Sequence, residues 1–122
     1  MKVLIVDDSR AMRLIVKQHV AKVPALGDAE ILEAENGEHA LAYFDGDDSP
    51  DLVFSDWHMP VLDGLGFLTA LRAKGSVVPF GFVTAERDDA LIQEALDAGA
   101  QFVISKPFTI EAFTERVASV GI

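Results

Sequence analysis

The feature that most constrains this chain is a regular alternation of short apolar runs with longer amphipathic segments. Residues 2–6 read Lys-Val-Leu-Ile-Val, a run typical of a strand buried on both faces of a parallel sheet. Similar runs recur along the chain, and apolar residues between them repeat at helical spacing. The pattern predicts strands at residues 2–6, 29–34, 51–55, 77–83 and 101–105, and helices at residues 9–22, 37–45, 64–74, 86–98 and 109–120.

This alternation predicts an α/β fold, in which a doubly wound five-stranded parallel sheet is covered by helices on both faces. We expect the strand order 2-1-3-4-5, with the weaker run at residues 29–34 on an edge. A length of 122 residues suits one domain. We therefore predict a single domain over residues 1–122, and Met1, one residue before the first strand, favours a natural start.

The charge balance excludes several classes of function. Ten Lys and Arg residues stand against twenty Asp and Glu residues, a formal net charge of -10, which disfavours binding to nucleic acid or to an anionic membrane surface. The chain has no cysteine, so a disulfide scaffold, a CxxC redox site and a thiolate zinc site are excluded. No apolar run is long enough to span a bilayer, and the first strand is too short for a signal peptide. We expect a cytoplasmic protein.

Polar side chains follow four of the predicted strands at their carboxyl ends, where doubly wound sheets bind ligands. The first strand leads into Asp7 and Asp8, the third into Asp56, the fourth into Thr84 and the fifth into Lys106. Each has an ordinary explanation when taken alone, since Asp8 and Thr84 are also typical helix caps and a lone lysine is usually solvated. Their coincidence at one edge of the sheet favours a functional site.

The three carboxylates of this edge would repel one another without a cation. A hard divalent ion with oxygen ligands and open water positions relieves that repulsion, and Mg²⁺ suits so small a set of protein ligands better than Ca²⁺ does. A carboxylate, Mg²⁺, a lysine and a hydroxyl together supply a nucleophile and the charge neutralisation that phosphoryl transfer requires.

At these residues the chain resembles the receiver domain of two-component response regulators, and among them the single-domain chemotaxis type most closely. The resemblance covers residues 2–120 and implies the flavodoxin-like (βα)5 receiver fold. It rests on Val6-Asp7-Asp8-Ser9-Arg10, Asp56-Trp57-His58-Met59-Pro60, Asp63-Gly64, Val83-Thr84-Ala85-Glu86, Ala98-Gly99-Ala100 and Lys106-Pro107-Phe108, in that order.

The resemblance implies a role for each residue of the site. Asp56 is expected to accept a phosphoryl group from a phosphohistidine of a sensor histidine kinase or a histidine phosphotransfer protein. Mg²⁺ is expected to be held by Asp7, Asp8, Asp56 and the backbone carbonyl of His58, with Asp7 acting mainly through water.

Lys106 is expected to pair with Asp56 and then with the phosphoryl oxygens, and the bond from Lys106 to Pro107 is expected to be cis. The Thr84 hydroxyl is expected to bind a phosphoryl oxygen and to begin the switch.

Four further residues are expected to modulate the site. His58 and Glu86 flank the phosphoryl position in the family, and we predict that they govern access of water; the alternative is that His58 is an inert loop residue. Ala85 lies between Thr84 and Glu86. At position 103 the chemotaxis pattern has an aromatic residue, whereas this chain has Val103. The adjacent Phe102 should point to the opposite face and pack in the core.

Without the aromatic residue, we expect the switch to use displacement of the loop after Thr84 and of the helix at residues 86–98. Trp57 is expected to be a partly exposed aromatic residue of the loop. Basic residues on the first predicted helix are a solvated face or, by the resemblance, a docking site for the phosphoryl donor. These residues are Arg10, Arg13 and Lys17.

The resemblance implies a signalling protein rather than an enzyme, with only self-phosphorylation and autodephosphorylation as activities. We expect a monomer whose phosphorylation is detected by another protein, with neither nucleic acid nor membrane as a partner. One alternative is a haloacid-dehalogenase-like phosphatase, but it normally needs Asp-x-Asp after the first strand, where this chain has Asp7-Asp8. The other is a small flavin-binding protein, which lacks support because acids replace its phosphate-binding loop.

Overall fold

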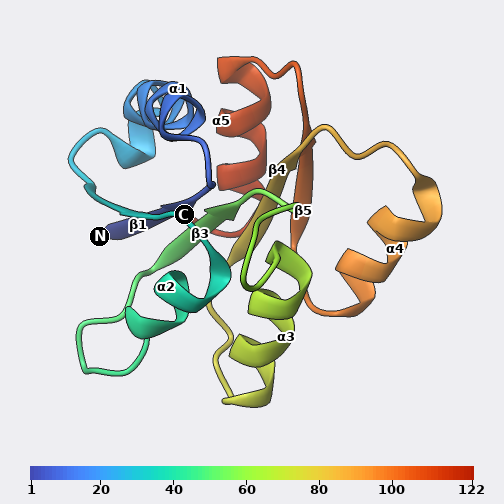
Figure 1. Ribbon diagram of the computed structural model, residues 1–122. Helices are drawn as coiled ribbons and strands as arrows, with labels where there is room; N and C mark the ends of the chain where they lie inside the picture. Colours follow the sequence, from blue (N-terminus) through green and yellow to red (C-terminus); the bar gives the residue numbers. More distant parts are fainter.

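The computed structural model describes residues 1–122, and its five strands form one parallel sheet (Figure 1). The strand order is β2-β1-β3-β4-β5, which confirms the predicted order and the edge position of β2. The interior strand β1 pairs with both β2 and β3, so the order of the chain reverses between β1 and β3. The strands are β1 (Lys2–Val6), β2 (Glu30–Ala34), β3 (Leu52–Ser55), β4 (Phe80–Thr84) and β5 (Phe102–Ser105).

Helices cover both faces of the sheet, as the doubly wound α/β fold requires. Figure 1 shows α1 and α5 on one face, with α2, α3 and α4 on the other. None of the helices is long and apolar enough to cross a membrane. The helices are α1 (Arg10–Ala21), α2 (Gly37–Ala42), α3 (Gly64–Ala73), α4 (Asp89–Asp97) and α5 (Ile110–Ser119), and a short 3-10 turn, η1, covers Pro24–Leu26.

The core has two layers because side chains alternate between the faces of each strand. From β1, Val3 and Ile5 point to the layer under α1 and α5, whereas Leu4 and Val6 point to the layer under the other helices. All four are buried. A strand buried on both faces has no polar side, which explains why the β1 sequence is almost continuously apolar.

Short polar side chains begin the α-helices and thereby fix where each loop turns back over the sheet. In each case the side chain accepts a hydrogen bond from a backbone N–H of the first turn, which would otherwise lack a partner. The capping residues are Ser9, Asn36, Asp63, Asp88 and Thr109.

Some boundaries differ from the prediction for local reasons. Helix α4 begins at Asp89 rather than at residue 86, because Asp88 has an extended backbone and caps the helix, and in the loop before it the Glu86 carboxylate accepts from the N–H groups of Arg87 and Asp88. Strand β4 begins at Phe80 rather than at residue 77, and Val77 is exposed. Helix α2 ends at Ala42, where the last backbone bonds tighten to three-residue spacing.

The prediction for Phe102 is confirmed. Its ring is buried under α5 beside Phe54 and Phe113, whereas Val103 packs into the opposite layer. The ring occupies space beside Gly81 on β4, where a Cβ atom would overlap it. The glycine at position 81 and the phenylalanine at position 102 are therefore complementary in volume.

Candidate functional site

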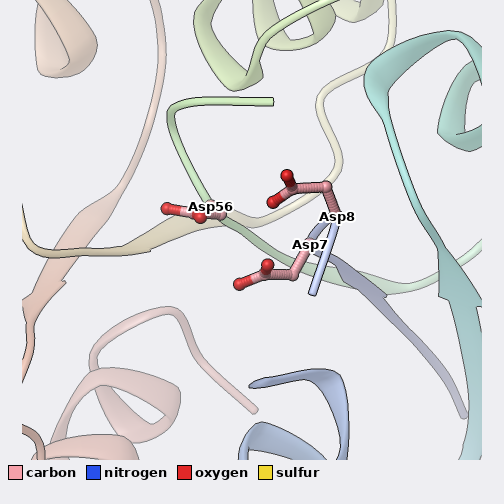
Figure 2. Close-up of side chains that lie close together, drawn as sticks. All are labelled: Asp7, Asp8 and Asp56. Carbon is pink, nitrogen blue, oxygen red and sulfur yellow. The ribbon is translucent and has the colours of Figure 1, made fainter. Parts of the chain in front are cut away.

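Three carboxylates meet at the carboxyl ends of β1 and β3, where the strand order reverses. Asp7 and Asp8 follow β1, Asp56 follows β3, and each offers a carboxylate oxygen within 4.8 Å of the others. Figure 2 shows the three side chains close together at the ends of these strands. Such a group could hold a metal ion, since carboxylate oxygens are the preferred ligands of hard divalent cations.

Asp7 is the most buried member of this group, with only 4% of its surface exposed. Its backbone N–H continues the ladder to Ala34, and its carboxylate accepts a hydrogen bond of 2.8 Å from the N–H of Ser9. Burial first, and then the nearby charge of Asp56, raise the pKa of the Asp7 carboxyl to about 6 against the opposing effects of the Ser9 hydrogen bond and of Lys106. A cation in the site would restore the ionised form.

Asp56 is held by the sheet and by the loop that follows it. Its N–H donates to the Val6 carbonyl at 2.8 Å, and its carboxylate oxygen Oδ1 accepts from the Trp57 N–H at 2.8 Å. Helix α3 begins close by, and a Cβ atom on Gly64 would overlap the Asp56 carbonyl. A glycine at position 64 is therefore what allows α3 to start beside the carboxylate cluster.

Lys106 reaches the carboxylates from the end of β5. Its ammonium nitrogen lies 3.7 Å from Asp7 and 3.8 Å from Asp56. The peptide bond to Pro107 is cis, as the resemblance implied. Thr84, at the end of the neighbouring β4, is 1% exposed, and its hydroxyl oxygen accepts from the Glu86 N–H at 3.1 Å. The sheet thus brings the acids, the lysine and the threonine to one edge.

His58 and Glu86 face each other across this edge. Nε2 of His58 lies 3.5 Å from a carboxylate oxygen of Glu86, although the two residues come from different loops. Ala85 is exposed beside Glu86.

No protein group donates to the backbone carbonyl of His58, whereas the Trp57 carbonyl accepts from the Gly64 N–H. That carbonyl therefore remains available as an oxygen ligand.

Two expectations near the site are wrong. Trp57 is buried rather than partly exposed, because its indole packs 4.8 Å from the Phe82 ring within the core. Arg13 is not part of a solvated basic face. Its guanidinium turns inward, donating to the Asp7 carbonyl at 2.7 Å and to Glu33 at 3.0 Å.

Arg13 is thus a residue of the site that sequence reasoning assigned elsewhere. It fixes the backbone that carries Asp7, and its helical position next to Arg10 and Lys17 concealed this role. Among the residues of α1 that remain exposed, Arg10, Leu14 and Lys17 lie at helical spacing on one face. We call these three residues the α1 face.

Comparisons with known proteins agree on one family. The family model described as the response regulator receiver domain matches residues 3–118. The probable chemotaxis protein CheY of Rhizobium etli is 38% identical, over 98% of this chain and 91% of its own length. CheY1 of Helicobacter pylori (strain J99) is 35% identical, over 98% of this chain and 96% of its own length. The solved structure of CheY4 from Vibrio cholerae has a TM-score of 0.83 at 30% identity, and the match covers 98% of this chain and 97% of that one.

The chain therefore belongs to the response regulator receiver domain family. It is a phospho-accepting signalling module of two-component systems, similar to the single-domain chemotaxis proteins. The haloacid-dehalogenase and flavin-binding alternatives are not favoured, because the receiver model accounts for almost the whole chain.

Proposed function

We propose that Asp56 is the residue that accepts the phosphoryl group, within a free-standing receiver of the chemotaxis type. The observation that carries the proposal is the position of the Asp56 carboxylate, which lies 3.8 Å from the Lys106 ammonium and within the cluster formed with Asp7 and Asp8. Asp56 is also the only member of the cluster that follows β3, the strand next to the reversal of strand order.

The reaction is a displacement at phosphorus. A carboxylate oxygen of Asp56 attacks the phosphorus of a phosphohistidine, the bond from phosphorus to nitrogen breaks, and the imidazole leaves and takes up a proton. No general base is needed because the attacking carboxylate is already ionised. Lys106 neutralises charge on the phosphoryl oxygens, and the Thr84 hydroxyl, which accepts from the Glu86 N–H, donates its own proton to one of them.

The residues at the site fit Mg²⁺. Asp8 and Asp56 would hold the ion directly with the free backbone carbonyl of His58, and Asp7 would hold it mainly through water. When bound, Mg²⁺ supplies positive charge that neutralises the phosphoryl oxygens. The fit is supported by the raised pKa of Asp7, which burial and the neighbouring charge of Asp56 cause and which a bound cation would lower.

The same site would reset itself. Water attacks the phosphorus, the bond between phosphorus and the Asp56 oxygen breaks, and phosphate and the free carboxylate are released. His58 follows Asp56 by two residues, Glu86 follows Thr84 by two, and their side chains meet at 3.5 Å from two different loops. We assign the control of water access to this pair. The only reactions that we assign to the protein are the phosphorylation and dephosphorylation of its own Asp56.

Two protein partners follow from this function. A histidine kinase or histidine phosphotransfer protein would donate the phosphoryl group, with the α1 face as its docking surface. An apolar Leu14, 55% exposed between two basic residues, suits a partner surface of mixed apolar and acidic character. A downstream protein would then recognise the phosphorylated form of this monomeric, cytoplasmic receiver.

The switch would move the loop after Thr84 together with α4. Val103 has no ring to turn inward, and it packs against the layer under α4. Amide shifts on phosphorylation should therefore extend through residues 86–106. Shifts confined to the residues around Asp56 would contradict this route.

Beryllofluoride, a mimic of the phosphoryl group, tests the proposal directly. Wild-type protein with Mg²⁺ and beryllofluoride should show a saturable change in Trp57 fluorescence, because the indole directly follows Asp56. Asp56→Asn should abolish the beryllofluoride response. An equal response in wild type and Asp56→Asn would exclude Asp56 as the acceptor.

A further inference from the structure

Arg87 makes a contact that connects two loops of the site. Its guanidinium donates a hydrogen bond of 2.7 Å to the backbone carbonyl of Lys106, nineteen residues further along the chain. Arg87 lies in the loop between β4 and α4, whereas Lys106 follows β5. The bond therefore joins the loop that carries Thr84 to the backbone that carries the lysine of the site.

The backbone of Lys106 needs this contact because it lies where the pairing of β4 with β5 ends. Its N–H donates to the Thr84 carbonyl at 2.9 Å, which extends the pairing of β4 with β5 by one residue. Beyond Lys106 the ladder stops, because Pro107 has no N–H. Arg87 is the donor to the Lys106 carbonyl, so both peptide groups of Lys106 are held by β4 and the loop after it.

Arg87 is itself fixed at its backbone. The Glu86 carboxylate accepts from the N–H groups of Arg87 at 3.1 Å and of Asp88 at 3.2 Å. Asp88 then caps α4, and the Glu86 N–H donates to the Thr84 hydroxyl. A displacement of this loop would move the Arg87 guanidinium with it, and so would pull on or release the Lys106 carbonyl.

We propose that Arg87 is a positioning residue for Lys106 and couples the loop carrying Thr84 to the end of β5. The coupling runs from the Arg87 guanidinium to the Lys106 carbonyl, in a chain that has Val103 where the chemotaxis pattern has an aromatic residue. This proposal deepens the proposed function of Asp56 and rests on it.

Loss of the contact should loosen the placement of the ammonium without removing it. Lys106 has a long flexible side chain, so a shift of its backbone spreads the positions that the ammonium can take near Asp56. Because Arg87 is exposed and makes a single charge-assisted bond, we expect phosphorylation by acetyl phosphate to slow about three- to tenfold in Arg87→Gln. Arg87→Lys should retain an intermediate rate.

The first arm of the test is independent of phosphorylation. In Arg87→Gln, the carbonyl ¹³C resonance of Lys106 should shift in the unphosphorylated protein, along with the resonances of the Lys106 side chain. Arg116→Gln is the matched control, since Arg116 is also exposed but lies on α5 away from Lys106 and the carboxylates. Unchanged Lys106 resonances in Arg87→Gln would overturn the proposal.

The second arm measures the phosphorylation rate with acetyl phosphate and Mg²⁺. The Arg87→Gln substitution should slow phosphorylation when it is made in the wild-type protein. It should have little further effect on the rate in a Lys106→Met background, because Arg87 acts through the ammonium. An equal slowing in both backgrounds, or a rate equal to that of Arg116→Gln, would overturn the proposal. Failure of the proposed function looks different: wild type itself would not be phosphorylated, although the Lys106 resonances would still respond to Arg87→Gln.

Discussion

The ammonium of Lys106 lies 3.8 Å from the Asp56 carboxylate and is also 3.7 Å from that of Asp7. It is thus a fixed cation shared by two of the three acids in the cluster. A single positive charge cannot balance three carboxylates, and burial, together with the nearby charge of Asp56, raises the pKa of Asp7. On the proposed function, Mg²⁺ would supply this pocket with further positive charge before Asp56 accepts a phosphoryl group.

Replacing Lys106 should separate metal binding from phosphoryl transfer. In Lys106→Met the ammonium no longer repels a divalent cation, so Mg²⁺ should bind about two- to tenfold more tightly. Phosphorylation by acetyl phosphate should nevertheless slow, because one donor to the phosphoryl oxygens is lost. Trp57 fluorescence measures the affinity, and weaker Mg²⁺ binding in the variant would contradict the repulsion inferred here.

The pKa of Asp7 predicts a pH-dependent stability in the absence of metal. Between the ordinary value of 3.8 and about 6, the folded protein retains a proton that the unfolded chain has lost. Stability therefore falls as the pH rises through this window. Asp7→Asn should stabilise the metal-free protein by about 1–3 kcal/mol at pH 7.5, with little gain at pH 4.

Urea denaturation in EDTA checks this prediction, and the asparagine keeps an oxygen that can accept from the Ser9 N–H. Comparing the variant with wild type at each pH cancels the titration of the other acids. A gain that is the same at both pH values would show that the substitution acts by packing rather than by removing a charge. Added Mg²⁺ should stabilise wild type more than the variant.

The contact between His58 and Glu86 predicts the lifetime of the phosphoaspartate. Because we assign control of water access to this pair, His58→Ala should shorten the half-life by about two- to tenfold. Glu86→Gln is the better substitution for the partner, because the amide oxygen still accepts from the N–H groups of Arg87 and Asp88. The two effects should not add, since the side chains are in contact.

Loss of radiolabelled phosphate after removal of the donor measures this half-life. Glu35→Ala, at an exposed acid outside this contact, provides the control. Half-lives that match wild type in both variants would leave His58 as an inert loop residue.

The complementarity of Gly81 and Phe102 predicts a large effect on stability. Gly81→Ala would force a methyl group into the Phe102 ring and should cost about 2–4 kcal/mol of unfolding free energy. Adding Phe102→Leu should recover part of this loss, because the smaller side chain leaves room. Urea denaturation measures both, and a cost below about 0.5 kcal/mol for Gly81→Ala would contradict the packing described.

The sequence predicted the strand order and the meeting of Asp7, Asp8, Asp56, Thr84 and Lys106, because both follow from the alternation of elements and from polar residues at strand ends. It did not predict features that depend on a single side chain bonding to a distant backbone group.

Arg13 and Arg87 show why. Each turns a guanidinium to a carbonyl of the site, and neither helical spacing nor a short motif reports such a contact. The start of α4 was misplaced because the extended backbone of Asp88, which caps the helix, is a local conformation that helical spacing does not report. Burial of Trp57 depends on its packing against Phe82 from a neighbouring strand, which the loop sequence does not reveal.

Chemical mapping of the acceptor tests the central claim most directly. Wild-type protein is incubated with acetyl phosphate and Mg²⁺, and the modified residue is located by mass spectrometry after peptide cleavage. One base-labile phosphoryl group should appear on Asp56, should be absent with EDTA, and should be lost in Asp56→Asn. A wild-type protein that gains no phosphoryl group, or a group that persists elsewhere in Asp56→Asn, would contradict the assignment of Asp56 as the acceptor.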